Sequence, residues 1–226
     1  MEILDNSKYK AQRMAPLVAG EPLLSRRTYN LLIGGTLVWG FVIDVIVAMF
    51  TYDIFLRINP IAVIVLYLVV SLASIVIIHR SDSAVISFAA FTALAAVMGL
   101  LLTGIISAYT ADSIFDAFVH TGIVCLGIGL LSTFFPNLFL RMGRGLFAAV
   151  VIVFLAEVAF LIFTHSTPQI TSIAMVLIFS GYFGYDLVRA QQYVPTADNA
   201  VDSAADIYID VINLFVRLLV IFGSRK

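Results

Sequence analysis

Two stretches near the C-terminus decide the fold: Gly181-Tyr182-Phe183-Gly184-Tyr185-Asp186 and Tyr208-Ile209-Asp210-Val211-Ile212-Asn213-Leu214-Phe215. Each places one aspartate inside an otherwise apolar segment. An ionisable side chain within a membrane is energetically costly, so such an acid is a functional candidate by default. Because Asp186 and Asp210 lie on consecutive apolar segments, we expect their carboxyl groups to act as a pair.

The composition places these segments in a membrane. Of the 226 residues, 62% are hydrophobic and 12% are charged, whereas soluble domains carry about 25% charged residues. The formal net charge is −1, and we expect no nucleic-acid partner because the sequence has no clustered basic face. The single cysteine, Cys125, cannot form an internal disulfide and is interpreted as a small buried hydrophobic residue.

Seven apolar runs follow a polar N-terminal tail. A helix of about 20 residues crosses a hydrocarbon core of about 30 Å. We predict runs at residues 29–51, 60–79, 84–109, a fourth ending near 135, and then 145–164, 168–190 and 203–223. Residues 137–144 and the segment with Asp198 and Asp202 are expected to be polar connections. The sequence therefore predicts an all-α integral membrane protein, with a cytoplasmic tail over 1–28 and a single seven-helix transmembrane domain over 29–226.

The positions of lysine and arginine predict the orientation. Five of the 13 basic residues lie in the tail. Four more fall in loops on the same side of an alternating topology: Arg80, Arg141, Arg144 and Arg189. Since cytoplasmic loops are enriched in basic residues, we expect a cytoplasmic N-terminus and an outward C-terminus. The basic C-terminal end favours the alternative, in which the seventh helix enters the membrane without crossing it.

A polar stripe predicts a central position for the seventh helix. At about 100° per residue, five polar side chains fall in one narrow arc, namely Ser203, Asp206, Asp210, Asn213 and Arg217. Such a stripe should face protein or water, so we expect helix seven at the centre of the bundle. On the sixth run, Ser180 and Gly184 form a small-residue contact on a face different from that of Asp186.

Asp186 and Asp210 should lie at similar depth, about 6 to 11 Å beneath the cytoplasmic surface. At a separation of about 4 Å their repulsion is about 4 kcal/mol for an effective dielectric constant of about 20, enough for the pair to share one proton near neutral pH. Loss of that proton would separate the helices or admit a cation, which predicts a proton-sensitive gate. The alternative is local pairing, of Asp186 with Arg189 and of Asp210 with Arg217 or Asn213.

Other ionisable residues are weaker candidates. Asp44 and Glu157 are intramembrane acids that either line an aqueous path or bond a neighbouring helix. Asp112, Asp116 and His120 recur every four residues near the start of the fourth run. They are interpreted as a solvated helix cap, with a weak metal site or an outer cation vestibule as the alternative. The histidines at segment ends, at positions 79 and 165, are expected to reach the membrane interface.

The C-terminal signature resembles that of the transmembrane Bax inhibitor motif family. The resemblance rests on residues 181–186 and, 24 residues after Asp186, on Asp210 within 208–219. It implies a seven-helix bundle with the last helix central, and a pH-sensitive calcium leak channel of the bacterial type whose sensor is the pair Asp186 and Asp210. In bacterial members an arginine at the end of helix two latches onto the helix-six aspartate, and Arg80 occupies that position here.

Calcium is the expected permeant ion, and the other expected partners are the lipid bilayer, protons and a membrane protein. Two carboxylates provide fewer oxygens than the roughly six to eight that Ca²⁺ prefers, so binding at Asp186 and Asp210 should be modest. Some family members carry an intramembrane glutamate in helix two, whereas residues 61–78 contain no acid. The lack of a cleavable signal fits either a bacterial plasma membrane or, if the source is eukaryotic, the endoplasmic reticulum, and the short loops favour the bacterial membrane.

Three other functions stay open. A proton-coupled cation exchanger would use the same acids but would need a counter-ion gradient. A non-conducting regulator would act on a membrane protease or a death-pathway partner. An intramembrane aspartyl protease is suggested by Tyr185-Asp186, but those enzymes carry Gly-x-Gly-Asp on the next helix, whereas Asp210 follows Tyr208-Ile209. We therefore expect no catalytic residues and no organic cofactor, since nucleotide and nucleophile motifs are also missing.

Overall fold

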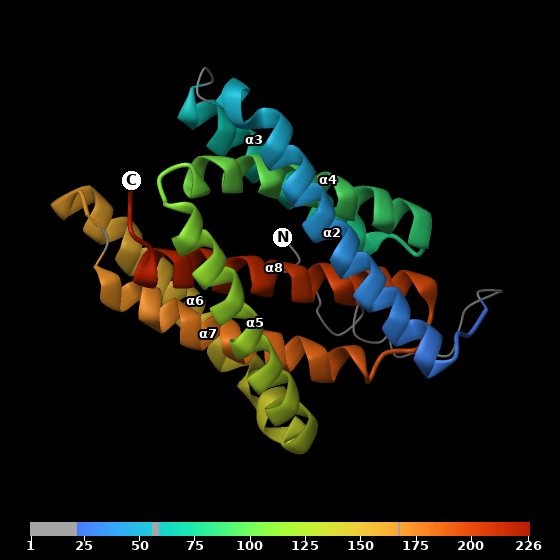
Figure 1. Cartoon of the computed structure of the whole chain (residues 1–226). Helices are drawn as coiled ribbons and strands as arrows, with labels where there is room; N and C mark the ends of the chain where they lie inside the picture. Colours follow the sequence, from blue (N-terminus) through green and yellow to red (C-terminus); the bar gives the residue numbers. More distant parts are fainter. Residues whose placement is uncertain (1–21, 56–58, 167) are drawn as a thin grey trace, which may run out of the picture. The chain divides into compact units, whose positions relative to one another are not determined.

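The computed structural model describes residues 22–55, 59–166 and 168–226 (Figure 1). Within these residues the chain forms seven α-helices and no β-strand: α2 (Arg26–Phe55), α3 (Pro60–Arg80), α4 (Ala84–Ile106), α5 (Ala111–Phe134), α6 (Pro136–Thr164), α7 (Gln169–Ala190) and α8 (Ala197–Phe222). The predicted all-α class is confirmed. Residues 1–21, which make up most of the predicted tail, lie outside the described part of the chain.

Among the described residues, six helices, α2 to α7, are long and apolar enough to cross a membrane. Large hydrophobic side chains on them are exposed, including Phe50 at 77% and Phe163 at 82%, as expected for helices that contact lipid. Helix α8 has 26 residues but is not among these six, because its acids and Arg217 lower its apolar character. Length and composition thus support six of the seven predicted spans.

Three predicted helix boundaries are wrong. Residues 137–144 were expected to connect two helices, but they form the first turns of α6. Pro136 lies in the first turn, where its missing N–H is not needed for a helical hydrogen bond. Helix α4 ends at Ile106 rather than near residue 109.

Helix α8 begins at Ala197 rather than near residue 203, so Asp198 and Asp202 are helical. The Thr196 hydroxyl accepts a hydrogen bond from the Asn199 backbone N–H at 3.1 Å, as a helix N-cap does. Asp198 lies in the first turn, where a negative charge is favoured by the helix dipole. The polar sequence at 196–199 thus starts the helix.

The ends of α3 follow from local sequence. The Asn59 side chain accepts a hydrogen bond from the Ile61 N–H at 2.9 Å and so caps the N-terminus. His79 and Arg80 occupy the last turn, and the N–H of the next residue, Ser81, bonds to the Ile77 carbonyl. Basic side chains in a last turn complement the helix dipole. This ending places His79 one residue before the end of the helix.

The chain forms two compact units, and α7 and α8 each contribute to both. The first unit comprises the described residues up to Gly104 together with Ala190–Asp206. The second comprises Ile105–Arg189 and Ile207–Lys226. The single domain over residues 29–226 stays a prediction.

In the first unit, buried polar contacts tie α2 and α4 to the beginning of α8. The Tyr29 hydroxyl, on a fully buried side chain, lies 3.1 Å from the Ser203 hydroxyl and 3.2 to 3.3 Å from two backbone carbonyls. The Ser87 hydroxyl of α4 donates to the Asp198 carboxylate at 2.7 Å. These bonds hold the first turns of α8 in place without relying on apolar packing alone.

In the second unit, glycines allow α7 to pack closely against α6. A Cβ atom added at Gly181 would lie 2.8 Å from the Leu146 side chain, and one at Gly184 would overlap the Phe139 ring. The close contact predicted at Gly184 is therefore confirmed. Because Gly184 precedes Asp186 by two residues, this packing also positions the acid.

Helix α8 is covered on most of its surface. Its buried apolar residues are Ala200, Val201, Ala204, Ala205, Ile207, Tyr208, Ile212, Leu214, Leu218 and Leu219. Its acids Asp202 and Asp210 are also buried, with exposed fractions of 2% and 4%. Apolar and acidic residues of the helix are thus both buried.

Candidate functional site

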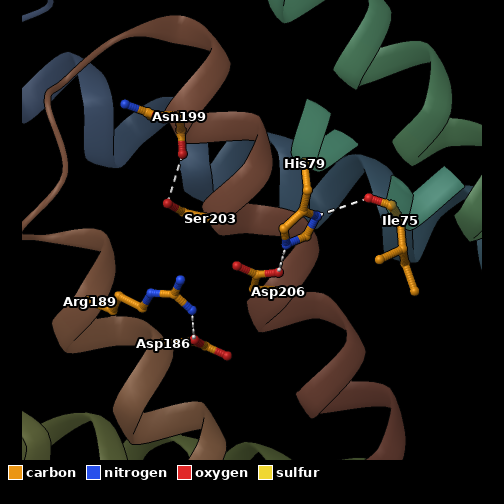
Figure 2. A network of polar contacts seen from close by, with 7 residues as sticks. All are labelled: Ile75, His79, Asp186, Arg189, Asn199, Ser203 and Asp206. Atoms are coloured by element: carbon orange, nitrogen blue, oxygen red, sulfur yellow. Dashed lines mark hydrogen bonds and ion pairs between the residues drawn. The ribbon is translucent and has the colours of Figure 1, made fainter. Parts of the chain in front are cut away.

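Asp186 lies in the last turns of α7 and forms an ion pair with Arg189. The Asp186 Oδ1 and Arg189 Nη1 atoms are 3.9 Å apart (Figure 2), at the long end of the range for such a contact. The Arg189 guanidinium also lies 5.6 Å from the centre of the Tyr185 ring, within the range of a cation–π contact. The local pairing that the sequence left open for Asp186 is therefore present.

Asp210, on α8, belongs to the same unit as Asp186. Tyr182 lies four residues before Asp186, on the same face of α7. Since a phenol O–H can donate to a carboxylate, Tyr182 is a third group of the candidate site, to which the sequence analysis assigned no role.

The polar stripe of α8 makes contacts with several helices. Ser203 contacts Tyr29 of α2, as described above, and Asp206 contacts α3. Asn213 instead donates to the Ile209 carbonyl within α8, at 2.8 Å. The side chains of the predicted stripe thus make separate contacts with different partners. In the sequence, Asp210 is the third of its five residues.

Arg217 forms a bidentate ion pair with Glu157 of α6. Its Nη2 atom donates to Glu157 Oε2 at 2.8 Å, and its Nη1 atom donates to Oε1. The sequence left Asp210 as a possible partner of Arg217, but the guanidinium is directed to Glu157. Of the two roles considered for Glu157, the structure supports the bond to a neighbouring helix.

The sequence predicted only that His79 reaches the membrane interface, but its imidazole ring makes two specific contacts. Its Nε2 atom lies 3.2 Å from the Asp206 Oδ1 atom, and its Nδ1 atom lies 3.0 Å from the Ile75 carbonyl oxygen (Figure 2). The contact with Asp206 was not predicted, because the position of His79 at the end of α3 does not indicate which residue of another helix lies beside it.

The remaining predicted site residues lie near helix ends or contact groups other than carboxylates; the His120 ring, for example, stacks on the Phe222 ring of α8. Arg80 is the last residue of α3, and its latch to Asp186 stays a prediction. Asp112 lies in the first turn of α5, and His120 Nδ1 lies 2.6 Å from the Asp116 backbone carbonyl. In the part of the chain that the structure describes, no three His, Cys, Asp or Glu side chains are grouped so as to hold a metal ion. The alternative metal site at the start of α5 is therefore not supported.

Sequence reasoning missed that Asp198 and Asp202 continue the helical spacing of Asp206 and Asp210. Asp198, Asp202, Asp206 and Asp210 follow one another at intervals of four residues. Residues four apart lie on one face of a helix, so this spacing extends the helix back to residue 198. The polar connection predicted at Asp198 and Asp202 is therefore wrong.

Comparison with known proteins identifies the family. The family described as "Inhibitor of apoptosis-promoting Bax1" matches residues 22–226. An uncharacterized membrane protein of Streptococcus pyogenes is 30% identical over 142 residues, which cover 60% of this chain and 62% of the relative. The inner membrane protein YbhL of Escherichia coli is 30% identical over 146 residues, covering 60% and 62%.

Protein lifeguard 4 of Mus musculus is 29% identical over 121 residues, which cover 53% of this chain and 50% of the relative. The matched region thus spans less than two thirds of the length of each of these relatives. The family match extends much further along the chain and includes every helix described above. The chain is a membrane protein and belongs to the Bax inhibitor family, as its C-terminal signature predicted.

Proposed function

We propose that the protein is a pH-sensitive leak channel for calcium or other cations, with Asp186 and Asp210 as its sensor. The observation that carries the proposal is the burial of Asp210 on α8 within the same compact unit as Asp186. Two carboxylates that approach each other within a protein repel each other, and the repulsion is relieved when the pair binds one proton. The occupancy of that proton would then depend on pH.

The packing around the two acids supports a gate at this position. Asp186 is held on α7 by the close contact of Gly184 with α6, and Asp210 is buried on α8. Protonation of the pair would allow α7 and α8 to approach, whereas its loss would separate them or leave a negative site for a cation. Arg189 would compete with the cation for Asp186, because the two side chains already form an ion pair.

We further propose that α8 crosses the membrane at the centre of the bundle, although its composition alone does not indicate a span. Burial of both its apolar and its acidic residues supports this position. The N-terminus is proposed to be cytoplasmic and the membrane to be a bacterial plasma membrane. Arg80 is retained as the proposed latch to Asp186, and no catalytic activity is proposed.

The test is calcium flux into liposomes that contain the purified protein and a trapped indicator. We expect flux in the wild type to change with external pH, and Asp186→Asn and Asp210→Asn each to abolish that dependence. Asp116→Asn is the matched control, because Asp116 is an exposed acid on α5 outside the proposed sensor. Flux that is indifferent to pH and to both sensor substitutions would contradict the proposal.

Two further measurements separate the rival functions. Flux that continues when ionophores remove the proton and counter-ion gradients indicates a leak, whereas flux that stops indicates an exchanger. A non-conducting regulator would show no flux and would bind its membrane partner equally well after both aspartate substitutions. Cleavage of a transmembrane reporter that is lost in Asp210→Ala would instead indicate a protease.

A further inference from the structure

His79 and Asp206 join α3 to α8 within the first unit. The imidazole has an acceptor at each of its nitrogens: the Ile75 carbonyl oxygen is 3.0 Å from Nδ1, and the Asp206 carboxylate is 3.2 Å from Nε2 (Figure 2). The side chains of His79 and Asp206 are 37% and 16% exposed, respectively, so both are partly buried. The contact thus links the last turn of one helix to the polar stripe of another.

The number of protons bound by His79 and Asp206 decides whether both contacts can form at the same time. A carbonyl oxygen and an ionised carboxylate can only accept hydrogen bonds, whereas a neutral imidazole has a single N–H. A neutral His79 beside an ionised Asp206 can therefore satisfy one contact but not both. Both contacts form together only when the pair carries one additional proton.

We propose that His79 and Asp206 form a proton-binding site, separate from Asp186 and Asp210, that holds α3 against α8 when it is occupied. The proton resides on the imidazole, because an unperturbed histidine binds a proton at higher pH than an aspartic acid does. The occupied site is an imidazolium with two N–H donors, one for the Ile75 carbonyl and one for Asp206. Release of the proton removes one of the two hydrogen bonds.

The charges on the surrounding helices favour a cationic imidazole. Helix α8 carries an acid one turn before and one turn after Asp206, and α4 has no titratable side chain over Ala84–Ile106. The other charged residues of this unit whose side chains the structure describes are Arg26, Arg27, Asp44, Arg80, Asp82 and Asp198. The acids on α8 therefore outnumber the one cation adjacent to His79 in sequence.

The first test reads the protonation of the ring directly. The chain has three histidines, so ¹⁵N-histidine labelling of the protein in lipid nanodiscs gives few imidazole NMR signals. The signals that disappear in His79→Gln are those of His79. At about pH 7.5, where an unperturbed imidazole is mostly neutral, we expect His79 to show two protonated nitrogens. In Asp206→Asn it should show one. A neutral His79 at this pH in the wild type would overturn the proposal.

The second test reads the effect on the fold. A proton held more tightly in the folded than in the unfolded state stabilises the fold at low pH, and this contribution is lost as pH rises. We expect the melting temperature of the wild type to fall more between about pH 6 and pH 9 than that of His79→Gln. His120→Gln is the matched control, because the exposed His120 ring lies against the Asp116 carbonyl of its own helix and the Phe222 ring of α8 rather than against a carboxylate.

Equal pH dependence of wild type and His79→Gln would contradict the proposed site. Neither experiment measures ion flux, so both remain informative if the protein does not conduct. Conversely, loss of pH-dependent flux in Asp186→Asn with an unchanged His79 signal would show that the two sites act independently.

Discussion

The ion pair between Glu157 and Arg217 gives the most direct stability prediction. Two parallel N–H···O contacts join the guanidinium and the carboxylate, a geometry that strengthens such pairs. The side chains of Arg217 and Glu157 are 22% and 11% exposed. Glu157→Leu would leave the guanidinium without its partner, and we expect the free energy of unfolding to fall by about 3 kcal/mol. This is the lower end of the range for breaking a buried pair, because Arg217 is partly exposed.

The assay is a double-mutant cycle with Glu157→Leu, Arg217→Met and the combination, followed by reversible unfolding in mixed micelles. The double variant should lie within about 1 kcal/mol of the wild type, since apolar residues of similar size often replace a buried ion pair without loss. The cycle should give a coupling energy of at least about 2 kcal/mol between the two residues. A coupling energy below about 0.5 kcal/mol would refute the reasoning.

Two further predictions concern helix contacts within each unit. Gly184→Ala should lower the free energy of unfolding by about 1 to 3 kcal/mol, because the added methyl group overlaps the Phe139 ring. Adding Phe139→Leu to this variant should restore part of the lost stability, and no restoration would argue against the contact. Tyr29→Phe should lower it by about 1 to 2 kcal/mol, because the hydroxyl that lies 3.1 Å from Ser203 is removed. Chemical unfolding measures both, and a Tyr29→Phe variant as stable as the wild type would show that the hydroxyl contributes nothing.

The helical class and most of the helices could be predicted because their signal is local. An apolar run of about 20 residues is sufficient evidence for a membrane helix, and six such helices are present in the described residues. The errors occurred where local polarity was taken as the end of a helix. Residues 137–144 contain two arginines and an asparagine but are helical, because polar side chains at a helix end can extend to the membrane interface without interrupting the backbone bonds.

The partners of the polar residues could not be predicted, because helical periodicity gives the face on which a residue lies but not the helix that covers that face. Asp210 was the candidate partner of Arg217 within its own helix, yet Arg217 pairs with Glu157, 60 residues earlier in the chain. His79 likewise pairs with Asp206 of another helix. The aspartate pair stays a prediction, made because two isolated acids in apolar segments are unusual wherever they lie.

Helix α8 explains why composition is a poor guide to a polar helix in a membrane protein. Its charged side chains would be costly if they faced lipid, because lipid offers no hydrogen-bond partners. Several of them are instead matched by groups on other helices: Asp198 by Ser87 of α4, Asp206 by His79 of α3, and Arg217 by Glu157 of α6. The polar groups that make α8 unsuitable for a lipid environment are therefore the ones that attach it to the protein. Because the contact between His79 and Asp206 depends on a proton, we expect a change in protonation there to alter the attachment of α8 to α3.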